Sequence, residues 1–209
     1  MGRAYVARHG ETDWNRAARY QGRRESHLTR LGERQAAALA AELVAGGAGR
    51  IVSSPLARCT QTARPIAEAL GLAVDTDDRL LEIAHGTWEG RLREDIERDD
   101  GARMQTWRHS PERVRFDGGE SLAAVNARWQ RFAESLDGKN DVIIVTHDVL
   151  VRLAILAAGG RPLADFWKPP VENGGYAVFE VRATRWRLIE ECHRTHLAGV
   201  SADARCQAL

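Results

Sequence analysis

Short apolar runs alternate with longer amphipathic stretches along this chain. Runs of β-favouring apolar residues predict strands at 3–8, 50–53 and 141–146. Between them, apolar residues recur at helical spacing and predict helices at about 30–45, 55–70, 122–136 and 149–158. Two more strands are predicted near the end, at 175–181 and 186–192, the second antiparallel or at an edge. This alternation indicates an α/β fold, a three-layer sandwich whose mainly parallel central sheet carries helices on both faces.

Some stretches depart from the alternation. Residues 11–27 are polar and predict a long loop, a length that is usually functional in a compact domain. A third short apolar segment lies within 72–84, and a charged insertion at about 91–117 predicts a small helical cap. The tail from about 197 is small and polar, so we expect it to be frayed. Without repeats or a low-complexity linker, a single domain is expected for 1–209.

Composition narrows the class of protein. The chain is 44% hydrophobic and 28% charged with a formal net charge of +1, so no global field favours a nucleic-acid or membrane partner. No apolar run is long enough to span a bilayer. The three cysteines are an odd number without C-x-x-C spacing, which predicts neither a disulfide framework nor a zinc site and fits the cytoplasm. No metal or other cofactor is expected.

Two of the predicted strands end in histidine, as Arg8-His9 and Thr146-His147. If the strands are parallel neighbours, both imidazoles emerge at the same edge of the sheet. Arg58 lies in the first turn of the helix after the second strand, so it points to that edge too. Arginine side chains and a helix N-terminus together make a site for a dianion.

Such a site suits phosphoryl transfer without a metal. A neutral imidazole nitrogen of His9 can attack phosphorus and form a phosphohistidine. Glu82, just before a glycine turn, is the candidate acid for the leaving group, and nearby phosphate charge should raise its pKa. Taken alone, Arg8-His9 also fits a strand end with two solvated charges.

Five segments in order resemble motifs of the histidine phosphatase superfamily, also called the phosphoglycerate mutase-like family. They are Arg8-His9-Gly10-Glu11-Thr12, Ser53-Ser54-Pro55-Leu56-Ala57-Arg58, Leu81-Glu82-Ile83, Gly118-Gly119-Glu120-Ser121 and Val145-Thr146-His147. The resemblance runs from about residue 4 to 181. The stretch after Glu82 resembles the phosphatase branch, because it lacks the Arg-His-Tyr-Gly string of the mutases.

The resemblance implies roles for individual residues. His9 would be the nucleophile and Glu82 the proton donor, while Arg8, Arg58 and His147 would hold the phosphoryl group. Substrate contacts are implied for Asn15, Gln21 and Gly22.

Position 148 departs from the family, which usually has Gly after its second histidine where this chain has Asp148. Two interpretations stay open: Asp148 caps the following helix, or it binds substrate hydroxyls. To avoid repelling a dianion it must point away or pair with an arginine such as Arg152. For His85, three residues after Glu82, lining the site is one interpretation, and the commoner one for a loop histidine is a solvated residue.

The resemblance therefore implies a metal-independent phosphatase that hydrolyses a small phosphomonoester, such as a sugar phosphate or a phosphoglycerate derivative, through a phosphohistidine. The rivals are a phosphoglycerate-type mutase and an inactive phosphate-binding module. The expected partner is a small phosphorylated substrate, and a homodimer is left open.

Overall fold

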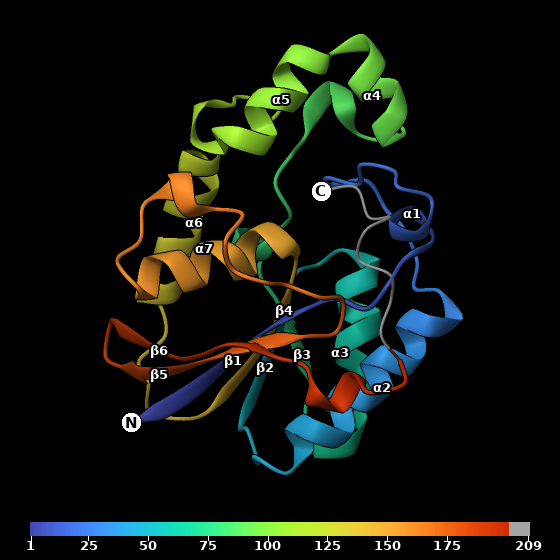
Figure 1. Cartoon of the computed structure of the whole chain (residues 1–209). Helices are drawn as coiled ribbons and strands as arrows, with labels where there is room; N and C mark the ends of the chain where they lie inside the picture. Colours follow the sequence, from blue (N-terminus) through green and yellow to red (C-terminus); the bar gives the residue numbers. More distant parts are fainter. Residues whose placement is uncertain (201–209) are drawn as a thin grey trace.

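The computed structural model describes residues 1–200. Its centre, within that range, is a six-stranded sheet of order β3-β2-β4-β1-β5-β6 (Figure 1). The strands are β1 (Gly2–Arg8), β2 (Arg50–Ser53), β3 (Val74–Thr76), β4 (Val142–Thr146), β5 (Tyr176–Arg182) and β6 (Arg185–His193). Strands β3, β2, β4 and β1 run parallel, whereas β5 is antiparallel to β1 and β6 to β5. The predicted mainly parallel sheet is confirmed.

Two pairs of helices cover the two faces of this sheet. One face carries α2 (Arg30–Val44) and α3 (Ala57–Leu70), and the other carries α6 (Leu122–Glu134) and α7 (Asp148–Ala158) (Figure 1). Successive residues of β4 serve the two cores, since Ile143 packs with the α2–α3 cluster and Ile144 with the α6–α7 cluster. The three-layer sandwich expected from the sequence is therefore present.

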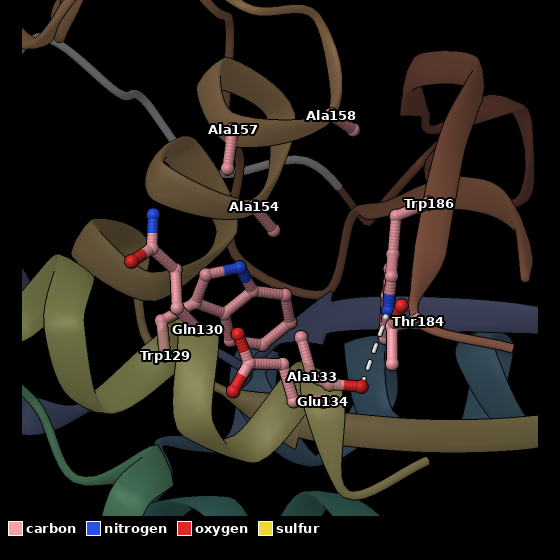
Figure 2. Close-up of a pocket in the computed structure, with 9 residues that line it drawn as sticks. All are labelled: Trp129, Gln130, Ala133, Glu134, Ala154, Ala157, Ala158, Thr184 and Trp186. Atoms are coloured by element: carbon pink, nitrogen blue, oxygen red, sulfur yellow. Dashed lines mark hydrogen bonds between the residues drawn. The ribbon is translucent and has the colours of Figure 1, made fainter. Parts of the chain in front are cut away.

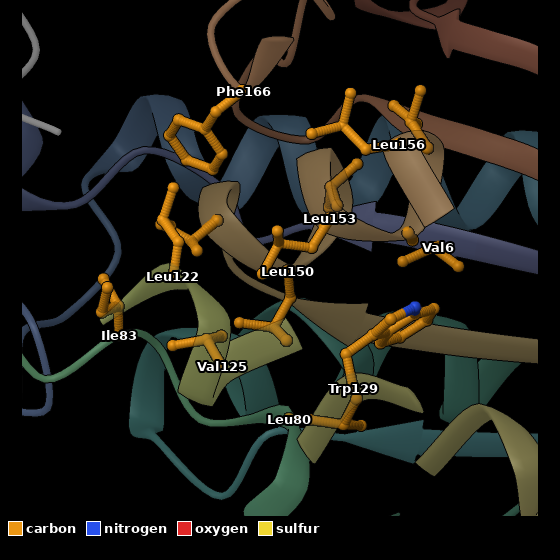
Figure 3. Packing of buried hydrophobic residues seen from close by; sticks show 14 of the residues in the cluster. Val6, Leu80, Ile83, Leu122, Val125, Trp129, Leu150, Leu153, Leu156 and Phe166 are labelled. Atoms are coloured by element: carbon orange, nitrogen blue, oxygen red, sulfur yellow. The ribbon is translucent and has the colours of Figure 1, made fainter. Parts of the chain in front are cut away.

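The larger core also fixes the segment that carries Glu82. Figure 3 shows Leu80 and Ile83 packed with residues of α6 and α7 such as Leu122 and Leu150. Leu80 and Ile83 are both fully buried. Because apolar side chains on both sides of Glu82 are sunk in the core, this carboxylate projects from an anchored stretch of backbone.

The charged insertion forms the predicted helical cap. Its two helices, α4 (Arg93–Asp99) and α5 (Gly101–His109), lie apart from the layers of the sandwich (Figure 1). The apolar anchors Ile96, Met104 and Trp107 are buried, which ties the cap to the larger core.

Two local expectations are wrong. The stretch predicted as an unbroken loop contains α1 (Asp13–Arg16), which begins with a capping box between Thr12 and Asn15. The helix expected from Pro55 begins at Ala57. Of the apolar segment 72–84, only β3 is a strand, and a 3₁₀ helix, η1 (Asp78–Leu80), follows it.

The end of the described chain is also ordered, against expectation. The 3₁₀ helix η5 (Thr195–Leu197) buries Leu197, which is 2% exposed. The carbonyl oxygen of Val200 accepts a hydrogen bond of 3.0 Å from Gln35 Nε2. Fraying is therefore wrong for 197–200, and the rest of the predicted tail, 201–209 with Cys206, lies outside the described residues.

Among the helices of residues 1–200, none combines the length and the apolarity needed to cross a bilayer.

Candidate active site

His9 directly follows β1 and is held by its backbone. Its amide donates to the carbonyl oxygen of Thr146 on β4 at 3.0 Å, and its own carbonyl accepts from the Asn173 side chain at 3.0 Å. The ring nitrogen Nδ1 lies 2.7 Å from the Gly10 carbonyl oxygen. A carbonyl only accepts, so Nδ1 carries the proton and the lone pair is on Nε2. Nε2 is therefore the nitrogen available for chemistry.

His147 emerges from the neighbouring strand β4 and faces His9. The two ring centroids are 5.3 Å apart. Arg58 donates from Nε to His147 Nδ1 at 3.2 Å, and a guanidinium only donates, so the His147 proton is on Nε2. That nitrogen donates to Ser54 Oγ at 2.8 Å. The predicted meeting of the two strand-end histidines at one sheet edge is thus found.

Both imidazoles are neutral near pH 7. Burial lowers the pKa of His9 well below its ordinary value, and the charges of Arg58 and Arg8 lower it further. Burial likewise lowers the pKa of His147, with Arg58 as the next cause. A neutral imidazole keeps the lone pair that a nucleophile needs.

Arg58 connects His147 with the backbone around Gly22. Its Nη2 donates to the Gly22 carbonyl oxygen at 2.7 Å and its Nη1 to that of Arg24 at 2.9 Å. The guanidinium is fully buried in the first turn of α3, as expected from the sequence. It therefore holds the segment around Gly22 over the two histidines.

Asp148 lies in the first turn of α7 and pairs with arginines on two sides. Its Oδ2 is 3.1 Å from Arg8 Nη1, and its Oδ1 accepts from Arg152 Nε at 2.5 Å. The capping interpretation is wrong, because the N-cap is His147 and no side chain caps this helix. The expected pairing with Arg152 is present. A contact with a substrate hydroxyl stays a prediction, and it would require one of these pairs to open.

Glu82 is the buried carboxyl group of the site, at 7% exposed. Burial raises its pKa to about 7, helped by the charge of Asp148, while a hydrogen bond from the Ile83 amide and the charges of Arg58 and Arg128 oppose the rise. Its carbonyl oxygen accepts from Arg128 Nη2 at 3.1 Å, which fixes the backbone. A carboxyl with this pKa can give and take a proton near neutral pH.

These groups line one small pocket. Its cavity volume is about 20 Å³, and its walls are Arg8, His9, Asn15, Gln21, Gly22, Arg58, Glu82, His85 and Val149. Asn15 is 1% exposed, and its Nδ2 has no hydrogen-bond partner within residues 1–200. Gln21 is buried and accepts from Ser26 Oγ at 2.6 Å. Of the predicted site residues, His147 and Asp148 lie just behind this wall, beside Arg58 and Arg8.

His85 lies in the pocket wall, so the preferred interpretation of a solvated loop residue is wrong. It is 4% exposed, and within the described chain neither ring nitrogen has a hydrogen-bond partner. The ring packs edge-on against Tyr20, Phe116 and Trp107. Burial lowers its pKa to about 3. Its spacing of three residues from Glu82 was the available signal, but nothing in the sequence showed the aromatic wall around it.

A roomier hollow lies elsewhere on the molecule and lacks this chemistry. It has a volume of about 350 Å³ and lies between α6, α7 and the turn before Trp186 (Figure 2). Trp129, Trp186 and several alanines line it, and the Trp186 indole N–H donates to the Ala133 carbonyl oxygen at 3.4 Å. Without a histidine or an arginine in its lining, it has neither a nucleophile nor a clamp for an anion.

The small pocket contains the groups needed to transfer a phosphoryl group to water. A neutral histidine presents Nε2, two buried arginines offer donors to an anion, and a carboxyl group with a pKa of about 7 lies in the same wall. Within residues 1–200, no cluster of three or more His, Cys, Asp or Glu side chains is arranged to hold a metal ion.

Comparison with known proteins agrees with the geometry. Residues 4–192 match the family model described as histidine phosphatase superfamily (branch 1). Phosphoserine phosphatase 1 of Hydrogenobacter thermophilus is 37% identical over 98% of this chain and 98% of its own length. The "Probable phosphoglycerate mutase GpmB" of Yersinia enterocolitica is 33% identical, over 78% of this chain and 77% of its own.

Solved structures show the same fold. YhfR of Bacillus stearothermophilus has a TM-score of 0.90 at 28% identity, covering 94% of this chain and 100% of its own. A mycobacterial glucosyl-3-phosphoglycerate phosphatase has a TM-score of 0.84 at 31% identity, covering 91% and 98%. The chain is thus similar over most of its length to several phosphatases with different substrates.

Proposed function

This chain belongs to branch 1 of the histidine phosphatase superfamily, and we propose that it works as a phosphatase of small phosphomonoesters through a phosphohistidine on His9. The observation that supports this most is the state of His9, which is buried and neutral and has Nε2 free of the Gly10 hydrogen bond. Phosphatase activity itself agrees with the relatives over nearly the whole chain.

In the first step, His9 Nε2 attacks phosphorus in line while the bond from phosphorus to the leaving oxygen breaks. Arg8 and Arg58 stabilise the charge on the equatorial phosphoryl oxygens. Glu82 gives its proton to the leaving alkoxide, so the alcohol departs neutral and Glu82 becomes a carboxylate.

In the second step, the same carboxylate takes a proton from a water molecule that attacks the phosphohistidine. The phosphorus–nitrogen bond breaks, inorganic phosphate leaves, and both His9 and Glu82 return to their starting states. A pKa of about 7 suits Glu82 to both halves of this cycle.

For the substrate we propose L-phosphoserine. The relative named as a phosphoserine phosphatase aligns with 98% of this chain. His85 offers a hydrogen-bonding nitrogen in the pocket wall, suited to a polar group of the substrate beyond its phosphate. The main rival is mutase activity, which the resemblance to the Yersinia protein supports.

The first test is hydrolysis of p-nitrophenyl phosphate in EDTA by the wild type and by His9→Ala. We expect turnover by the wild type and a loss of at least about a thousandfold in the variant, because the variant lacks the imidazole that attacks phosphorus. Rapid quenching in base should trap one phosphoryl group per wild-type chain. Surviving turnover in His9→Ala, or a phosphoryl group on another residue, would remove the proposed nucleophile.

The second test compares L-phosphoserine, 3-phosphoglycerate and sugar phosphates by release of phosphate. We expect the highest kcat/KM with L-phosphoserine, and release of phosphate from 3-phosphoglycerate without formation of the 2-isomer. Interconversion of the two phosphoglycerates faster than phosphate release would establish the mutase instead.

A further inference from the structure

We propose that Asp148 and Arg152 form a buried ion-pair row that positions Arg8 for binding the phosphoryl group. This inference rests on the proposed function, because it concerns the anion clamp beside His9.

The three side chains form a continuous row. Arg152 donates from Nε to Asp148 Oδ1 at 2.5 Å and from Nη2 to Oδ2 at 3.4 Å. Oδ2 is in turn 3.1 Å from Arg8 Nη1. Arg8, Asp148 and Arg152 are 2%, 1% and 6% exposed, so water does not screen these contacts.

One loop fixes both ends of the row. Arg8 Nη1 donates to the Val171 carbonyl oxygen at 3.2 Å, and Arg152 Nη1 donates to the carbonyl oxygen of Pro169. The Arg152 guanidinium also lies over the Trp167 ring, 5.2 Å from its centroid. Pro169 is followed by Pro170, whose ring restricts the backbone between these anchors. The loop therefore holds the two arginines at a set separation, with Asp148 between them.

The row also sets the charge of the site. Arg8 and Arg152 stand on either side of the Asp148 carboxylate, so the row as a whole keeps one positive charge. Arg58 adds another buried guanidinium on the other side of the pocket. Without Asp148, three buried guanidinium groups would repel one another, and Arg8 would lose the partner that fixes its orientation.

Asp148 acts in this arrangement through Arg8, without touching the substrate. Both of its oxygens are engaged by arginines, and the residue is absent from the lining of the cavity. It is therefore a positioning residue, and its effect on turnover should disappear when Arg8 is removed.

A double-mutant cycle tests this dependence, with Asp148→Asn, Arg8→Met and the double variant assayed on L-phosphoserine and p-nitrophenyl phosphate. We expect Asp148→Asn alone to lower kcat/KM by about tenfold to a hundredfold, because a misplaced clamp costs this much. In the Arg8→Met background the same change should cost less than about twofold. If the losses in kcat/KM of the two single variants multiply in the double variant, the proposal is overturned.

The alkaline limb of kcat/KM gives a second readout that a purely structural role would not move. Glu82 is faced by Asp148 from α7, Arg58 from α3 and Arg128 from α6, and it shares its pocket with Arg8, His9 and His85. Since the charge of Asp148 raises the pKa of Glu82, Asp148→Asn should shift the fall in kcat/KM to lower pH. An unchanged limb would contradict the proposed placement of this carboxylate.

Asp165→Asn is the matched control. Asp165 also pairs with basic side chains, at 2.7 Å from Lys168 Nζ, but it lies outside the pocket. We expect it to leave kcat/KM and the pH limb unchanged. If Asp148→Asn does not fold, Asp148→Asn/Arg152→Met replaces it in the cycle, because that pair also removes the buried Arg152 charge that Asp148 neutralises.

The cycle also separates the two proposals. An inactive wild type would end the proposed function and this inference together. An active wild type that depends on His9, with multiplying losses at Arg8 and Asp148, would end the positioning role alone.

Discussion

The two histidines at the centre of the pocket are buried alike but present different nitrogens. His9 donates a hydrogen bond from Nδ1 to the Gly10 carbonyl oxygen, whereas His147 accepts one at Nδ1 from Arg58 and donates one from Nε2. The hydrogen bond at one nitrogen decides what the other can do. The first ring is thus arranged as a nucleophile and the second as a donor.

The ionisation of Glu82 should set the pH dependence of kcat/KM. Above about pH 7 it loses the proton that the leaving alkoxide needs, so kcat/KM should fall there. Glu82→Gln should remove this limb and lower kcat/KM on L-phosphoserine by about a hundredfold or more. On p-nitrophenyl phosphate the loss should be smaller, because p-nitrophenolate leaves without a proton. Equal losses on both substrates would argue against Glu82 as the acid.

The sequence was informative for residues that lie at strand and helix ends. His9, His147 and Arg58 could be placed together because parallel strands meet at one edge and α3 starts there. Arg152 could be expected as a partner of Asp148 from its spacing. The surroundings of His85 and the second partner of Asp148, Arg8, could not, because they depend on contacts with Phe116, Trp107 and the end of β1. No local pattern near either residue encodes those contacts.

At the scale of elements, the beginning of α2 supports the pocket. Thr29 is its N-cap, with Oγ1 accepting from the Gly32 amide at 3.1 Å and donating to Glu11 Oε1 at 2.7 Å. Gln35, one turn further on, accepts from the Glu11 amide at 2.8 Å. The helix thereby holds the residues just after His9.

Thr29→Ala should therefore lower the free energy of unfolding by about 1 kcal/mol, the usual cost of a lost N-cap. Thr29→Ser, which keeps the hydroxyl, should restore most of it. Urea unfolding at neutral pH measures both. If Thr29→Ser were as unstable as Thr29→Ala, the cap would not be the cause.

Apolar spacing predicted the positions of the long helices and strands, but it predicted their first and last residues less accurately. α1 was missed because its four residues, Asp13–Arg16, are mostly polar and too few to show a periodic face. η5 was missed because Leu197 is its only buried residue, and a single apolar side chain forms no pattern. Both are held by contacts with distant segments, such as the hydrogen bond between the Asp13 amide and His27.

For the molecule as a whole, the buried histidines predict sensitivity to acid. Burial lowers the pKa of His9, His147 and His85, whereas each has its ordinary value near 6.5 when unfolded. The unfolded chain therefore binds more protons below about pH 6.5, so stability should fall as pH drops through that value.

Urea unfolding at about pH 8 and about pH 5 measures this loss. His85→Phe removes one of the three histidines and fits the surrounding aromatic rings, so it should lose less stability on acidification than the wild type. An identical pH dependence in the two proteins would mean that His85 ionises freely in the folded state.

The adjacency of β1 and β4 has a consequence for how activity arises. His9, the proposed nucleophile, follows β1, and His147 follows β4, which is synthesised much later. The two strands hydrogen-bond directly to each other. A nascent chain emerging from the ribosome should thus be inactive until β4 has been synthesised and has paired with β1. During refolding, turnover should therefore return later than helix formation. Its return should report when β4 pairs with β1.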